Sequence, residues 1–274
     1  MSKIHIIKSG LVAFMIASIW IMAGGCQHKS EEIKNPVFVA IDTADANNTY
    51  QILAKCPKQL ADSLYRSLFY TLSKQGQSQL LSDHLQEYQK IDAGSPTTVA
   101  ISNLYTGVIF SQKARYDSAL FHIDKALREI STDKFPLEFL VALRTKAICH
   151  SAKGNYDLAI ALRHQTIRLC EKNQDTVGRF QELGELGIAL FMAHDYRRAT
   201  QFIDSSAHFF KKSKNESLEA YFLSARSVIY FSFNNYDSAI VTAKKSLDLR
   251  IKNGELDGQA ESYNNIALPY MGKG

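Results

Sequence analysis

Cysteine is scarce in this sequence, and its spacing excludes two kinds of site. The 274 residues include four cysteines, and no two of them form a Cys-x-x-Cys pair. Neither a disulfide scaffold nor a zinc site is therefore indicated. We expect Cys56, Cys149 and Cys170 to act as small apolar residues on helix faces.

Catalytic and cofactor motifs are absent as well. The sequence contains no His-Glu-x-x-His, no Gly-x-Ser-x-Gly, no phosphate-binding loop and no glycine-rich dinucleotide motif. His150 is adjacent to a cysteine, but we expect it to be a packed side chain rather than a metal ligand. We therefore predict no enzyme activity, no catalytic residue, no cofactor, no metal and no small-molecule substrate. A hydrolase is the least favoured alternative.

Neither sign of charge dominates the chain. It carries 32 Lys and Arg residues against 27 Asp and Glu residues, a net charge of +5, and the two signs are mixed along its length. A nucleic-acid-binding surface needs a concentrated basic patch. We therefore predict no nucleic-acid partner.

The first 25 residues have the pattern of a signal peptide rather than of a folded segment. Lys3 and Lys8 give a basic start, and an apolar run follows from Leu11 to Met22. This run is shorter than the roughly 20 residues that a membrane-spanning helix needs. Small residues directly before Cys26 resemble the lipobox of bacterial lipoproteins. That resemblance implies cleavage before Cys26 and lipidation of this cysteine.

A lipid on Cys26 predicts where the protein is located. It implies anchoring in the bacterial cell envelope, with residues 26–57 as a tether to the membrane. The aspartate that retains lipoproteins in the inner membrane is absent, because Gln27 follows the cysteine. This favours the outer membrane, facing either the periplasm or the cell surface. An ordinary secretory signal and a permanent N-terminal membrane anchor are the alternatives.

Tyrosines spaced forty residues apart are the most informative pattern in the chain. Each opens a Tyr-x-x-Ala phrase, formed by Tyr116 with Ala119, Tyr156 with Ala159, Tyr196 with Ala199, and Tyr236 with Ala239. Nine residues before each tyrosine stands a small residue: Gly107, Ala147, Gly187 and Ser227. A fixed period between 20 and 50 residues is typical of solenoids.

These aligned positions predict a helical hairpin in every unit. Apolar or small residues spaced i, i+4, i+7, as in Leu183, Gly187 and Leu190, indicate a first helix. A second helix starts at the tyrosine, and an N-cap residue precedes it in three units (Asn155, Asp195 and Asn235). Stacked hairpins bury apolar faces that no single hairpin can bury alone, so we predict an all-α solenoid.

The pattern resembles the tetratricopeptide repeat (TPR) family. Small residues in the first helix, an aromatic residue three positions later and Tyr-x-x-Ala at the start of the second helix are that family's main positions. Its usual unit has about 34 residues, so these units resemble extended variants. The resemblance implies a right-handed superhelical α-solenoid of stacked antiparallel helix hairpins. HEAT and armadillo repeats, at about 40–47 residues, are the alternative, but they lack the Tyr-x-x-Ala helix start.

The alignment also divides the chain into segments. Residues 58–95 are predicted to form a degenerate N-terminal capping repeat, beginning with a helix at about residues 58–74. TPR-like repeats then follow over residues 96–274, at about 96–133, 134–174, 175–214 and 215–254, with a half repeat at 255–274.

The last four residues, 271–274, are expected to form a turn. Pro269 is unexpected inside a helix, and the next tyrosine would fall two residues beyond Gly274. This favours a chain that continues beyond Gly274 over a last helix that has diverged as an end cap.

The TPR resemblance implies a concave groove, lined by the first helices, that holds a peptide or helix of a protein partner. The corresponding residues here are Tyr105, Arg144, Glu185, Phe191, Tyr221 and Phe231. The leading hypothesis is therefore a membrane-anchored interaction scaffold in the cell envelope. The alternative is the sensory N-terminal part of a longer TPR-containing transcriptional regulator or histidine kinase.

Overall fold

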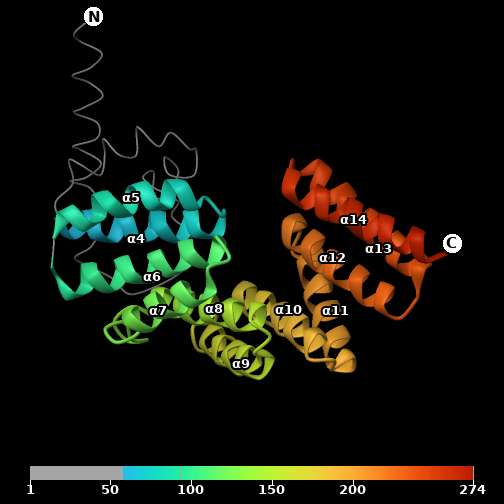
Figure 1. Ribbon diagram of the computed structural model, residues 1–274, viewed down its shortest axis with the longest axis horizontal. Coiled ribbons are helices and arrows are strands. Elements are labelled where there is room, and N and C mark those ends of the chain that lie inside the picture. The colour runs from blue at the N-terminus through green and yellow to red at the C-terminus, as the bar shows by residue number, and fades with distance from the viewer. Residues whose placement is uncertain (1–57, 93, 274) are drawn as a thin grey trace, which may run out of the picture. The chain divides into compact units, whose positions relative to one another are not determined.

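The computed structural model describes residues 58–92 and 94–273, which form eleven helices and no strand (Figure 1). The predicted signal peptide, Cys26, the tether and Cys56 lie outside these described residues. The all-α class predicted from the sequence is confirmed.

The helices form successive antiparallel hairpins, each with a first helix, A, and a second helix, B. The pairs are α4 (Lys58–Lys74) with α5 (Ser78–Ile91), α6 (Pro96–Gln112) with α7 (Tyr116–Ala126), α8 (Pro136–Ala152) with α9 (Tyr156–Lys172), α10 (Thr176–Met192) with α11 (Tyr196–Lys212), and α12 (Glu216–Ser232) with α13 (Tyr236–Lys252). A further A helix, α14 (Leu256–Lys273), follows. All four tyrosines of the repeat begin a B helix, as predicted.

The structural unit is a helix of 17 residues followed by a short reversing turn. Every helix from α8 to α13 has this length. Each turn after them passes through one residue with positive φ: Gly154, Gln174, His194, Lys214, Asn234 and Gly254. A left-handed residue after the helix end is a common C-cap. The forty-residue sequence period therefore consists of two structural units of equal length.

Two of the three predicted N-caps make the capping hydrogen bond. The Asp195 and Asn235 side chains accept from the backbone N–H three residues further on, at 3.1 and 3.3 Å. Asn155 occupies the same position, but its side chain makes no capping bond. Asp175 and Asn215 cap A helices in the same way, so side-chain caps occur at both kinds of turn.

The small residues of the repeat lie where helices A and B of one hairpin touch. A Cβ atom on Gly187 would lie 3.0 Å from the carbonyl oxygen of Ala199 and 2.8 Å from the Ile203 side chain. Gly107 stands in the same relation to the B helix of its own hairpin. The alanines of the Tyr-x-x-Ala phrases have no exposed surface: Ala119, Ala159, Ala199 and Ala239. Small side chains therefore set how closely the two helices approach.

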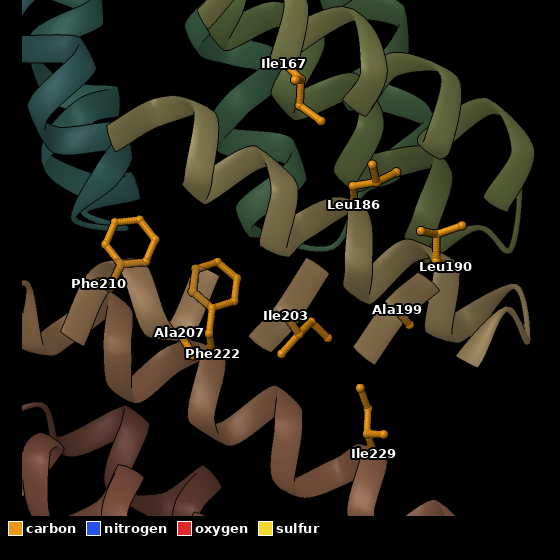
Figure 2. Close-up of a cluster of buried hydrophobic side chains, with 9 residues drawn as sticks. All are labelled: Ile167, Leu186, Leu190, Ala199, Ile203, Ala207, Phe210, Phe222 and Ile229. Carbon is orange, nitrogen blue, oxygen red and sulfur yellow. The ribbon is translucent and has the colours of Figure 1, made fainter. Parts of the chain in front are cut away.

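The hydrophobic core runs from hairpin to hairpin. Figure 2 shows a cluster of nine buried residues: Ile167, Leu186, Leu190, Ala199, Ile203, Ala207, Phe210, Phe222 and Ile229. Six of them belong to α10 and α11, and the other three come from the neighbouring helices α9 and α12. The central hairpin thus depends on its neighbours to cover its apolar surface, as expected of a repeat protein.

The end of the described chain differs from the expected turn. Residues 271–273 continue α14, and Pro269 lies buried inside that helix. Lys273 donates to Asp237 at the start of α13 at 2.6 Å. The helix therefore passes through Pro269, although proline removes one backbone hydrogen bond.

We predict that two substitutions in the turns change stability in opposite directions. Gly154 and Lys214 both have positive φ, 77° and 58°. No atom lies within 4 Å of a Cβ added to Gly154, so Gly154→Ala adds backbone strain alone and should cost about 1–2 kcal/mol. Lys214→Gly removes backbone strain and should raise the unfolding free energy. The gain should be smaller than the cost of Gly154→Ala, because glycine loses more conformational freedom on folding. Urea denaturation of both variants measures the two changes, and a loss of stability on Lys214→Gly would contradict this account.

Candidate interaction surface

The A helices form a row that is the candidate interaction surface. α6 packs against α4 and α8, and α12 packs against α10 and α14, whereas the B helices mainly contact the A helices before and after them. We call the surface of the A helices the A-helix face. All six residues predicted to line the groove belong to A helices.

A buried ion network between α8, α9 and α10 joins two hairpins. Glu182 of α10 accepts hydrogen bonds from Arg144 Nε of α8 at 2.6 Å and from Arg163 Nη1 of α9 at 2.9 Å. Thr166 donates to the same carboxylate at 2.8 Å, and Arg163 Nη2 also donates to Glu185 at 3.1 Å. The side chain of Glu182 is 1% exposed and that of Arg163 is 6% exposed. We call these five residues the Glu182 network.

The network keeps Glu182 ionised. Burial favours the neutral acid, but the charges of Arg163 and Arg144 outweigh it and hold the pKa of Glu182 below its ordinary value. The Glu185 carboxylate, together with burial, raises the pKa of Tyr221 on α12 well above the ordinary value. Tyr221 is therefore a neutral hydrogen-bond donor to Glu185, and the network extends from α8 to α12.

The two cysteines in the described part of the chain are unpaired and buried. Burial raises the pKa of the Cys170 thiol to about 11, although nearby Arg144 opposes this effect. Burial also raises the pKa of Cys149. Thiols that stay protonated at neutral pH are poor nucleophiles. Both residues therefore serve as the small apolar residues predicted from the sequence.

Two further arginines, half-buried Arg66 and buried Arg250, tie hairpins together. Arg66 of α4 donates to Asp62 at 3.0 Å and to Glu138 of α8 at 2.7 Å. Arg250 of α13 donates to Glu261 of α14 at 3.0 Å. A buried charge is costly unless it is paired, so each arginine fixes which helix lies beside it. Much of the charge on the A-helix face thus serves the stack itself.

The structure gives the predicted groove residues different surroundings. Tyr105 is fully buried, and its ring centroid lies 5.1 Å from that of Phe69. A partner resting on the surface would not reach Tyr105, so the groove role assigned to it does not fit this placement. Arg144 and Glu185 belong to the Glu182 network. Phe191, Tyr221 and Phe231 are half-buried.

Phe191 and Phe231 lie at the ends of their A helices, within a series of aromatic contacts. The ring centroids of Phe191 and Tyr196 are 5.5 Å apart, and those of Tyr196 and Phe233 are 5.3 Å apart. Those of Phe231 and Tyr236 are 6.0 Å apart. Phe233 is 54% exposed and Met192 is 45% exposed. We call this group the aromatic edge: Phe191, Met192, Tyr196, Phe231, Phe233 and Tyr236.

Several residues of the Glu182 network and of the aromatic edge are not predicted from the sequence. Arg163 and Glu182 look like ordinary helix-surface residues, because nothing local shows that they pair across hairpins. Phe233 does leave a signal, since a large apolar residue stands in the turn where earlier repeats have Lys113, Lys153 and Ala193.

Two searches of residues 58–92 and 94–273 found no further kind of site. No helix there is long and apolar enough to cross a membrane. The same residues contain no cluster of three or more His, Cys, Asp or Glu side chains that is suited to a metal ion.

We predict that Glu182→Gln destabilises the fold by about 3–5 kcal/mol at neutral pH, because it leaves Arg144 without its carboxylate partner and buried Arg163 with Glu185 alone. The matched control is Glu171→Gln, which removes an exposed pair with Arg179 at 2.9 Å and should cost at most about 1 kcal/mol. Urea denaturation at pH 7 compares the two variants. Equal losses of unfolding free energy in the two variants would show that the Glu182 network adds no stability.

The lowered pKa of Glu182 also predicts how the stability of the protein depends on pH. Because folding lowers the pKa of Glu182, its contribution is present in full above its ordinary pKa of 4.5 and is lost as the pH falls through the lower folded value. The wild type should therefore lose more stability than Glu182→Gln between pH 5 and strongly acidic pH. Parallel pH profiles would contradict this prediction.

Comparison with known proteins extends the description of the fold. No protein-family model matches the sequence, and no curated protein matches it. One similar solved structure is a signal transduction ATPase with numerous domains (STAND) from Pyrococcus horikoshii, which has a tetratricopeptide repeat sensor. The TM-score is 0.58 at 13% identity, over 85% of this chain and 41% of that protein. The apo form of RapI is also similar, with a TM-score of 0.54 at 12% identity, over 87% of this chain and 97% of RapI.

At sequence identities of 13% and 12%, the similarity to these two structures concerns the fold alone. This chain spans less than half the length of the STAND protein that it matches. Both structures share the arrangement of consecutive packed helix pairs that is described above. The chain therefore has the TPR-like helical solenoid fold that its tyrosine repeat predicts.

Proposed function

We propose that this protein is a non-catalytic scaffold that binds a protein partner through the aromatic edge. The observation that carries the proposal is the exposure of Met192 and Phe233 beside the half-buried rings of Phe191 and Tyr196. Aromatic residues and methionine are enriched at protein interfaces. Contiguous exposed apolar surface on a folded protein marks such sites.

The Glu182 network supports the same proposal, because it fixes polar groups on the helices that carry the edge. Glu185 lies on α10 with Phe191, and Tyr221 lies on α12 with Phe231. These half-buried groups would orient a peptide or helix whose apolar side chains rest on the edge. A few convergent polar groups beside apolar surface are typical of such recognition.

We further propose that the scaffold is attached to the bacterial cell envelope by a lipid on Cys26, with the outer membrane favoured. The support is the lipobox-like segment before this cysteine. Labelling cells with palmitate should give a labelled protein, and Cys26→Ser should remove the label. An unlabelled wild-type protein would exclude this anchor.

The second candidate is the sensory part of a longer regulator. It is favoured by the similarity to a STAND protein in which the tetratricopeptide repeats form a sensor. The mass of the native protein in cell extracts separates the two candidates. A native protein of 274 residues or fewer would exclude the longer regulator.

We predict that Phe233→Ala strongly weakens partner capture while the fold stays intact. A photo-crosslinking residue at Met192 should capture the partner from intact cells. Adding Phe233→Ala should then reduce that capture by tenfold or more, since central aromatic side chains contribute about 2 kcal/mol or more at interfaces.

The matched control for this experiment is Phe121→Ala on α7, which removes another exposed phenylalanine away from the edge. It should leave capture unchanged, and both variants should melt at the wild-type temperature. Equal capture by the Phe233→Ala and Phe121→Ala proteins would exclude the aromatic edge as the binding site.

A further inference from the structure

An ion pair at the turns ties one hairpin to the next, and it recurs in the stack. The aspartate that follows the tyrosine of a B helix pairs with a lysine at the end of the next A helix. Asp117 pairs in this way with Lys153, and Asp237 pairs with Lys273. The two residues stand 36 positions apart in both pairs. The repeat therefore predicts the same pair at two further positions between them.

Both of these further pairs are missing from the middle of the stack. Asp157 has Ala193 in the place of the lysine, and Arg197 has Phe233 there. Asp157 and Arg197 are both exposed, and neither forms an ion pair within the described part of the chain. Two charges that would tie hairpins together elsewhere in the stack are therefore free here.

Arg197 is also unfavourable for its own helix. It stands in the first turn of α11, where the helix dipole favours an acidic side chain. The other B helices that begin with a repeat tyrosine carry an aspartate at this position: Asp117, Asp157 and Asp237. Arg197 thus stabilises neither α11 nor the contact between hairpins, so the fold gives no reason for its charge.

The free arginine lies inside the aromatic edge. It follows Tyr196, whose ring centroid is 5.3 Å from that of Phe233. The nearby Asp195 carboxylate already accepts from Arg198 at 2.6 Å. Arginine and aromatic residues together are enriched at protein interfaces, and a guanidinium binds a carboxylate through two parallel hydrogen bonds. The edge therefore offers a cationic group beside its apolar surface.

The free aspartate lies at the border of the same surface. Ala193, which replaces the lysine partner of Asp157, directly follows Met192 of the aromatic edge. A free carboxylate at the start of α9 and a free guanidinium at the start of α11 thus accompany the exposed apolar side chains. Opposite charges beside an apolar surface distinguish the two directions of a bound segment.

We propose that the partner presents an apolar segment with two opposite charges, an Asp or Glu carboxylate over Arg197 and a Lys or Arg side chain over Asp157. This inference rests on the aromatic edge as the binding surface. The reverse direction would place like charges together, so the segment binds in one orientation.

Selection of short random peptides on the full 274-residue chain tests this charge pattern. Only peptides whose binding is lost on Phe233→Ala are kept. Those selected on the wild type should carry Asp or Glu beside an aromatic or aliphatic residue. Selection on Arg197→Asp should enrich Lys or Arg at that place instead, and selection on Asp157→Lys should replace the basic residue by an acidic one.

The peptides selected on the wild type should bind Arg197→Asp about fivefold more weakly or worse, because an attraction becomes a repulsion. Arg197→Asp should nevertheless melt at or above the wild-type temperature, since it removes a cation from the first turn of α11. A residue with a structural role alone would not lose binding while the fold gains stability.

The matched control is Arg168→Asp, which changes the net charge by the same amount at another exposed arginine. Arg168 lies far along α9, about 18 Å from the start of that helix at 1.5 Å per residue. This variant should bind the peptides within twofold of the wild type. Equal losses in the two variants, or the same peptides selected on the wild type and on Arg197→Asp, would overturn the inference and leave the aromatic edge as the binding site. A selection without any peptide that depends on Phe233 would overturn the proposed function as well.

Discussion

The rest of the structure depends on the close approach of helix A to helix B at a small residue. At Gly187 even one added carbon atom would press on the backbone of Ala199. This contact lets two 17-residue helices pack closely as a hairpin, and the hairpins can stack. Without it the hairpins would separate, and the continuous core seen in Figure 2 could not form.

Apolar packing between such similar units does not by itself specify which helices meet. Paired arginines add to that specificity, because a buried charge such as that of Arg163 needs carboxylates at hydrogen-bonding distance, here those of Glu182 and Glu185. The same arrangement limits function, since polar residues engaged between hairpins are less available to a partner. The accessible aromatic side chains at the turns then become the better candidates for recognition.

The proposed binding surface arises from one departure from the regular repeat. The aromatic edge exists because Phe233 stands in a turn, where its neighbours cannot cover it. This surface follows from a single large apolar residue in an otherwise regular stack.

The sequence by itself determined the helices and their order. The tyrosine period, the small residues and the N-caps act within one hairpin, so a helix at about residues 58–74, where α4 lies, and the start of α11 at Tyr196 could both be predicted. Only the tertiary structure decided which side chains are accessible. Tyr105 is buried, Arg144 is bound to Glu182, and α14 remains helical to Lys273. These outcomes depend on contacts between residues about forty positions apart, whose geometry no local pattern encodes.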